Sequence, residues 1–160
     1  MRPTDRPIRV LIADDEETFR TVLARELNDM GFEVRGVAGG AQALAALNDA
    51  EFDVVLLDVK MPDMDGLTVQ KAVKEAHPLV EVILMTGYGT IDNAIAAIRS
   101  GAYDYLTKPC KLEELEALLI KAAERRRLEH RNIMLRQELS RQTRADEFVG
   151  DSPRLCAVLS

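Results

Sequence analysis

A long apolar run is absent from this sequence. No stretch approaches the roughly 18 apolar residues of a membrane-spanning helix, and the N-terminal MRPTDRPIRVLIADDE turns acidic early. We therefore expect no membrane association and no export signal, and we predict a cytoplasmic protein. Cysteine is also scarce, because Cys110 and Cys156 are the two present and they form neither a close pair nor a metal-binding cluster. Two distant cysteines fit a reducing compartment, where each serves as a small apolar side chain.

Positive charge is also in deficit. The formal net charge is −6, which argues against a general nucleic-acid-binding surface. The basic residues instead gather between Lys121 and Arg144, where eight basic residues accompany three acidic ones. With 160 residues, 47% hydrophobic and 30% charged, the chain suits one compact domain of roughly 120 to 150 residues with an appendage.

The first 120 residues alternate short β-rich runs with amphipathic helical patterns. The predicted strands are 8–13, 32–38, 53–58, 81–86 and 103–106, and the predicted helices are 19–31, 41–50, 67–76 and 90–101. The first, third and fourth strands are almost continuously apolar, as buried parallel strands are, and Gly31 and Gly101 follow two helix ends. This alternation predicts a (βα)5 α/β fold: a doubly wound parallel five-stranded sheet, flavodoxin-like with strand order 2-1-3-4-5. Its binding crevice would lie at the carboxyl ends of the strands.

Polar residues mark the carboxyl ends of four predicted strands. Asp14 and Asp15 follow the first strand and Asp58 ends the third, while Thr86 ends the fourth and Lys108 follows the fifth. Crowded carboxylates repel one another unless a cation lies among them, so this group suits Mg²⁺, with a hydroxyl and an ammonium placed to hold a phosphoryl group. Taken singly, the aspartates could be helix N-caps or turn residues. Their coincidence at four strand ends favours a shared site.

Four motifs carry a family resemblance. IADDEE, LLDVKMPDMDG, MTGYG and YLTKP, in this order, resemble the signatures of two-component response-regulator receiver domains over residues 7–122. The resemblance implies that Asp58 accepts a phosphoryl group from a histidine of a sensor kinase, and that the chain is not itself an enzyme. It also implies Mg²⁺ bound by the carboxylates of Asp15 and Asp58 and by the backbone carbonyl of Lys60. Asp14 would act mainly through metal-bound water.

The same resemblance implies a conformational switch. Thr86 and Lys108 would contact the phosphoryl oxygens, and Tyr105 would rotate as Thr86 moves. The peptide bond between Lys108 and Pro109 would be cis, as X-Pro bonds allow.

Competing motifs are incomplete. GYGTID, residues 87–92, has only the first two glycines of a dinucleotide-binding loop, and DMDG, residues 63–66, would lack the first ligand of an EF-hand loop. Aspartyl-phosphate hydrolases would require a second aspartate where Lys60 stands. His77 and His130 lie far apart in the pattern, and we assign neither a catalytic role.

Residues 112–144 contain no internal glycine or proline and predict one helix. About 30 helical residues would extend about 45 Å, beyond the domain that starts the helix. A heptad a/d frame is occupied by Leu118, Arg125, Leu128, Asn132, Leu135 and Leu139, and an asparagine at an a position is typical of two-stranded coils. We therefore predict a coiled-coil homodimer. A solvated basic helix and a DNA-contacting helix are the alternatives.

The final stretch, ADEFVGDSPRLCAVLS, resembles the opening of the AAA+ ATPase domain of σ54-dependent transcription activators, and no GxxxxGK loop follows it. The predicted parts are an N-terminal tail (1–7), a receiver domain (8–120), a coiled-coil linker (112–144) and a truncated AAA+ start (145–160). The predicted partners are the sensor kinase, a second copy and the AAA+ domain of the parent chain, with no direct DNA binding by this piece. A stand-alone phosphorelay or scaffold receiver is the alternative, and a metal-dependent phosphatase is a third.

Overall fold

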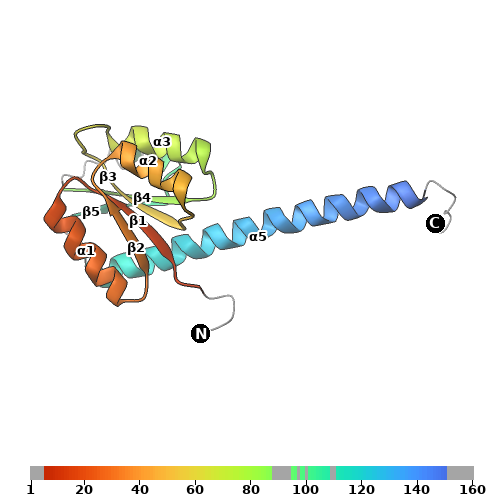
Figure 1. Ribbon diagram of the computed structural model, residues 1–160, viewed down its shortest axis with the longest axis horizontal. Coiled ribbons are helices and arrows are strands. Elements are labelled where there is room, and N and C mark those ends of the chain that lie inside the picture. The colour runs from red at the N-terminus through yellow and green to blue at the C-terminus, as the bar shows by residue number, and fades with distance from the viewer. Residues whose placement is uncertain (1–5, 88–94, 97, 100, 109–110, 151–160) are drawn as a thin grey trace. The chain divides into compact units, whose positions relative to one another are not determined.

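The computed structural model describes residues 6–87, 95–96, 98–99, 101–108 and 111–150, with side chains up to residue 141. Strands and helices alternate along most of the chain, and a long helix follows the last strand (Figure 1). The elements are β1 (Arg9–Ala13), α1 (Glu17–Asp29), β2 (Glu33–Val37), α2 (Gly40–Asp49), β3 (Val54–Asp58), α3 (Gly66–Ala76), β4 (Glu81–Thr86), β5 (Asp104–Thr107) and α5 (Leu112–Gly150).

The five strands form one parallel sheet in the order β2-β1-β3-β4-β5. This confirms the predicted flavodoxin-like fold and its strand order. The register pairs Ala13 of β1 with Leu57 of β3, so the residues that follow them, Asp14 and Asp58, lie at the same edge of the sheet. Thr86 of β4 pairs with Thr107 of β5, which brings Lys108 to that edge as well.

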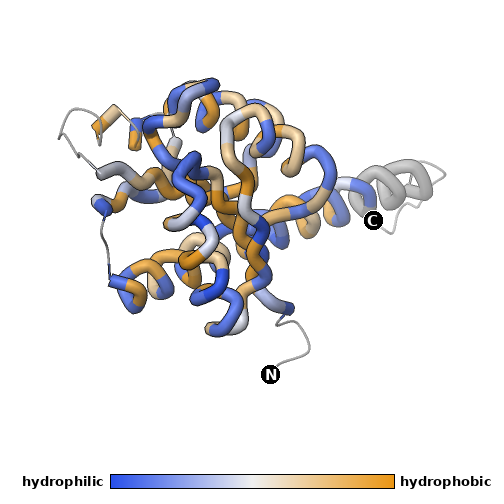
Figure 2. Tube along the Cα trace, turned by 60° about the vertical axis from the view of Figure 1, so that its left-hand side comes forward, coloured by the Kyte–Doolittle hydropathy of each residue, from blue (hydrophilic) through white to orange (hydrophobic). Residues whose placement is uncertain are grey.

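Two hydrophobic cores cover the two faces of the sheet. Helices α2 and α3 pack on one face, and α1 and the first part of α5 pack on the other (Figure 1). Every residue of β3 and β4 is buried, which explains why these strands are nearly continuous apolar runs. Figure 2 shows the same arrangement, with hydrophobic residues concentrated along the central strands.

Two predicted helix ends depend on glycine. Gly31 and Gly101 both have φ of 105°, a backbone conformation that other residues rarely adopt. Both lie where the sequence predicted a helix to end. Of the predicted helix 90–101, the described residues 95–96 and 98–99 are helical, and most of the remainder lies outside the described residues.

The contacts divide the chain into two units, Met1–Arg126 and Arg127–Ser160. In the first unit, α5 contributes the buried residues Leu115, Leu119, Ala122 and Ala123 to the core that it shares with α1. Leu118, which the heptad frame assigned to the coil, packs partly against this same core. Arg126 is 9% exposed, and its Nη1 donates to Oδ1 of the buried Asp53 at 3.1 Å. The packing of the first unit therefore extends past residue 120.

In the second unit, the described part of α5 exposes its apolar side chains. The exposed apolar residues are Leu128, Ile133, Met134, Leu135 and Leu139. No helix within the described ranges has the length and apolar character needed to cross a membrane.

Candidate metal and phosphoryl site

Three carboxylates meet at the carboxyl edge of the sheet. Asp14 and Asp15 follow β1 and Asp58 is the last residue of β3, and one oxygen from each lies within 4.8 Å of the others. Asp14 is 2% exposed and Asp58 is 8% exposed, whereas Asp15 is exposed. The sequence prediction that these three residues converge is borne out by this geometry.

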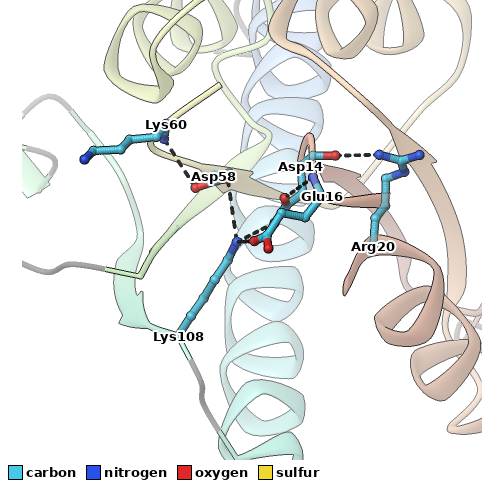
Figure 3. A network of polar contacts seen from close by, with 6 residues as sticks. All are labelled: Asp14, Glu16, Arg20, Asp58, Lys60 and Lys108. Carbon is cyan, nitrogen blue, oxygen red and sulfur yellow. Dashed lines mark hydrogen bonds and ion pairs between the residues drawn. The ribbon is translucent and has the colours of Figure 1, made fainter. Parts of the chain in front are cut away.

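Lys108, which directly follows β5, extends its side chain toward this cluster (Figure 3). The Nζ of Lys108 lies 2.6 Å from Oδ2 of Asp14 and 3.6 Å from Oδ2 of Asp58. It also lies 3.4 Å from Oε1 of Glu16 and 4.4 Å from the centroid of the Phe19 ring, in a cation–π contact. Burial disfavours the ammonium, but the hydrogen bond and charge of Asp14, with the charge of Asp58, raise the pKa of Lys108 above its ordinary value.

Asp14, the first residue after β1, is held in place through its backbone and its side chain. The backbone N–H of Asp14 donates to the carbonyl oxygen of Val37 at 3.1 Å, and its carbonyl oxygen accepts from Nη1 of Arg20 at 2.7 Å. The backbone N–H of Glu16 donates to Oδ1 of Asp14 at 2.9 Å. One carboxylate oxygen of Asp14 is therefore fixed by the loop and the other by Lys108 (Figure 3).

Asp58 is held in an environment that disfavours its charge. Burial raises the pKa of Asp58 from 3.8 to about 6, and the neighbouring charges of Asp14 and Asp15 act in the same direction. The ammonium of Lys108 and the backbone N–H of Lys60, which donates to Oδ1 of Asp58 at 3.3 Å, act against this rise. A buried carboxylate with too little compensation is a position where a bound cation is strongly favoured.

The donor set fits a magnesium ion. Three carboxylates offer hard oxygen ligands at close range, and the exposed position of Asp15 leaves room for the water molecules that Mg²⁺ retains. The chain supplies no nearby thiol or imidazole among these residues, which would suit a softer metal.

Thr86 and Tyr105, which the family resemblance assigned to a switch, lie on the neighbouring strands β4 and β5. Thr86 ends β4, is 3% exposed, and its carbonyl oxygen accepts from the backbone N–H of Lys108 at 2.7 Å. Tyr105 pairs with Leu84, which lies two residues before Thr86, so Thr86 and Tyr105 face the same side of the sheet. Tyr105 packs against the core under α3, and its buried hydroxyl has no hydrogen-bond partner among the described residues. Pro109, for which a cis peptide was predicted, lies outside the described residues.

Sequence reasoning did not single out three residues of this network: Glu16, Phe19 and Arg20. Glu16 stands next to the predicted acidic pair but carried no sign of its contact with Lys108. Of the three, Arg20 alone is unusual in the sequence, because a basic residue in the first turn of a helix interacts unfavourably with the helix dipole. The reason for its position becomes clear in the structure, where its guanidinium donates to the carbonyl oxygen of Asp14.

The fold and the site together define a class of signalling domain, in which a strand-end aspartate is surrounded by acidic residues, a hydroxyl and a lysine. The sequence profile of the response regulator receiver domain matches residues 10–120, and the chain belongs to this family.

Individual relatives agree with this assignment. The chain is 40% identical over 147 residues to an NtrX-like response regulator from Rickettsia bellii, covering 91% of this chain and 30% of that protein. A crystal structure of NtrX from Brucella abortus in complex with ADP superposes with a TM-score of 0.76 at 35% identity, over 81% of this chain and 30% of that one. The solution structure of a beryllofluoride-activated NtrC4 receiver domain dimer gives a TM-score of 0.71 at 36% identity, over 74% of this chain and 98% of that one. The chain thus spans about 30% of the length of its NtrX-like relatives.

Proposed function

We propose that this chain is the phosphorylation-controlled receiver of a σ54-dependent transcription activator, with Asp58 as the residue that accepts a phosphoryl group from a histidine of a sensor kinase. The observation that carries the proposal is the position of Asp58 at the tip of β3, buried, beside two further carboxylates and 3.6 Å from the ammonium of Lys108. The protein would act in the cytoplasm.

The site supplies what phosphoryl transfer needs. A carboxylate oxygen of Asp58 attacks the phosphorus of the phosphohistidine, a P–O bond forms as the P–N bond breaks, and the imidazole leaves with the bonding electrons and takes up a proton. Mg²⁺, held by the carboxylates of Asp15 and Asp58 and the carbonyl of Lys60, with Asp14 acting through water, would neutralise charge on the reacting oxygens. The raised pKa of Lys108 means that its burial does not cost the side chain its positive charge, so it can pair with the new phosphoryl group.

Transfer would change the contacts of Thr86 and Tyr105. A phosphoryl group adds negative charge and acceptor oxygens beside Asp58, toward which the Thr86 hydroxyl and Lys108 would move. The space left by Thr86 would be taken by the ring of Tyr105, which faces the same side of the sheet and has no hydrogen bond from its hydroxyl to lose among the described residues. The surfaces of β5 and of residues 90–100, which lie partly outside the described residues, would then be remodelled.

The linker would form a parallel dimer with a second copy. The described side chains of Leu128, Asn132, Leu135 and Leu139 are exposed along one heptad frame and need a partner to be buried. Leu118 packs partly on the receiver core, so the shared seam would begin at Leu128. Because the seam is short, contacts between the two receivers would also contribute to the dimer. These receiver contacts would repack on phosphorylation. Residues 145–160 would lead into the AAA+ domain, whose assembly the unphosphorylated dimer would restrain.

Charges beside this seam give the dimer a testable salt dependence. In a parallel two-stranded coil with this frame, Arg131 of one helix would face Arg136 of the other, and Glu124 would face Glu129. Like charges repel, so salt would strengthen a parallel dimer by screening them.

A stand-alone phosphorelay or scaffold receiver is the second candidate, and the parent gene distinguishes the two. A Walker A loop encoded beyond Ser160 supports the activator, and a stop codon there supports the alternative. The polarity of control can be measured as ATPase activity after deletion of residues 1–110 from the parent. Activity rises if the receiver represses and stays low if phosphorylation builds activating contacts.

Intact-mass spectrometry after incubation with a small phosphodonor tests the proposed function. The wild-type chain should gain one phosphoryl group when Mg²⁺ is present and none in chelator. Asp58→Asn should gain none, while Asp15→Ala should need more Mg²⁺. Turnover of the donor without any stable gain would instead indicate a metal-dependent phosphatase.

A further inference from the structure

Asp63 forms a cap across two elements that are far apart in the sequence. It lies in the loop between β3 and α3, residues 59–65, and accepts the backbone N–H of Gly40 on Oδ1 at 3.1 Å and that of Ala41 on Oδ2 at 3.0 Å. These donors belong to the first turn of α2, whose own N-cap residue, Gly39, has no side chain to offer. The bonds to Ala41 and Gly40 hold the pKa of Asp63 below its ordinary value.

The close approach of α2 to this loop depends on the absence of two side chains. A Cβ at Gly39 would lie 2.9 Å from Oδ1 of Asp63, and a Cβ at Gly40 would lie 2.6 Å from Cγ2 of Val69 in α3 and 3.0 Å from Cβ of Met64 in the loop. A side chain at Gly39 would displace the Asp63 carboxylate, and one at Gly40 would crowd both α3 and the loop. The contact between α2 and the loop is therefore a specific packing arrangement, and Asp63 is its polar component.

The same loop carries the residues beside the phospho-acceptor. It is fixed at its start by the bond from the N–H of Val59 to the carbonyl of Met85 at 3.0 Å, and it closes by the bond from Gly66 N–H to the carbonyl of Val59 at 2.7 Å. Lys60 lies between Val59 and the Asp63 cap, and its N–H donates to Asp58. The direction of the Lys60 carbonyl depends on how both ends of this short segment are held.

We propose that Asp63 is a positioning residue for the metal: by tying the loop between β3 and α3 to the start of α2, it orients the carbonyl of Lys60 toward the cation held by Asp15 and Asp58. This inference rests on the proposed function, in which Lys60 provides a backbone ligand. Asp63 itself would not be a metal ligand. Loss of supporting contacts around metal ligands weakens binding by about 10- to 100-fold. Asp63 is exposed and acts on the ligand only through the loop, beside buried neighbours such as Met61, so we expect an effect at or below the lower end of that range.

The test compares two caps of the same loop by titration calorimetry with Mg²⁺. Asp63→Ala should weaken Mg²⁺ binding about three- to tenfold, and Asp63→Asn, which keeps one acceptor oxygen, should restore part of the affinity. Asp65→Ala is the matched control, because Asp65 caps its own helix through the N–H of Thr68 at 2.8 Å, and among the described residues its side chain forms no hydrogen bond to another element. It should lose helix stability while its Mg²⁺ affinity stays within about twofold.

Two further measurements distinguish a specific effect on the Lys60 carbonyl from a general loss of structure in the loop. Amide hydrogen exchange at Gly40 and Ala41 should accelerate in Asp63→Ala and not in Asp65→Ala. The Mg²⁺ concentration for half-maximal phosphorylation should rise in Asp63→Ala, with the maximal extent unchanged. Wild-type affinity in Asp63→Ala, or an equal loss in Asp65→Ala, overturns the role of Asp63 alone. A wild-type chain that binds no Mg²⁺ overturns the metal in the proposed function as well.

Discussion

The raised pKa of Asp58 predicts that its ionised side chain destabilises the metal-free protein. Its folded pKa is about 6 against an ordinary 3.8, and each pKa unit corresponds to about 1.4 kcal/mol, so ionisation costs about 3 kcal/mol of folding free energy above pH 6. Asparagine resembles the neutral carboxyl group in shape. Asp58→Asn should therefore raise the free energy of unfolding by about 1–3 kcal/mol at a pH of about 7.5 in chelator.

The sign of the pH dependence follows from the direction of the shift. A folded pKa above the unfolded value means that the folded state binds the proton more tightly, so the contribution of Asp58 to stability is fully present below 3.8 and is lost as pH rises through about 6. Between a pH of about 7.5 and a pH of about 5, the wild-type protein should gain about 1.4 kcal/mol from this residue, and Asp58→Asn should not. Both proteins carry the same histidines, so the histidine titrations cancel in the difference.

Urea unfolding followed by circular dichroism measures this difference, and Mg²⁺ provides the control. Added Mg²⁺ should stabilise the wild-type protein more than Asp58→Asn, since the variant has lost one carboxylate ligand. The reasoning is refuted if Asp58→Asn is less stable than wild type in chelator near neutral pH. It is also refuted if the difference between the two proteins does not vary across this pH range.

Three other predictions concern the lifetime of the phosphoryl group, the dimer and the linker junction. Lys60→Ala combined with Tyr88→Ala should speed loss of the acyl phosphate. Lys60 stands two residues beyond Asp58 and Tyr88 two beyond Thr86, and both side chains are large enough to shield the acyl phosphate from water. Phosphate-release kinetics in which the double mutant is equal or slower would contradict this. Leu128→Asp or Leu135→Asp should convert the dimer to a monomer in sedimentation, whereas the wild-type dimer should strengthen as salt rises. Arg126→Met should lower the free energy of unfolding by about 3 kcal/mol, because it removes the guanidinium that lies 3.1 Å from the buried carboxylate of Asp53; an unchanged urea midpoint would contradict that.

The fold was predictable because its central strands are buried on both faces. In β3 and β4 every residue is buried, so a short apolar run could be recognised without an alternating pattern. The site residues were predictable for a related reason: parallel strands end at a common edge, and the register that pairs Ala13 with Leu57 brings Asp14 and Asp58 together.

The features that were not predicted depend on packing between distant segments. The cap from Asp63 to Gly40 and Ala41 spans more than twenty residues and has no local pattern. Leu118 fits both a heptad seam and the core under α1, because the two periodicities overlap on one helix, and the structure places it partly in the core. Arg126 belonged to the basic segment, and its burial against Asp53 could not be inferred from charge alone.

Chemical trapping of the acyl phosphate tests the central claim most directly. After incubation with Mg²⁺ and a small phosphodonor, borohydride reduces an aspartyl phosphate to homoserine with release of phosphate, and peptide mass spectrometry locates the changed residue. The account predicts homoserine at position 58, dependent on Mg²⁺, and unmodified aspartate at positions 14 and 15. Homoserine at Asp14 or Asp15, or none at Asp58 in a chain that has gained a phosphoryl group, would contradict it.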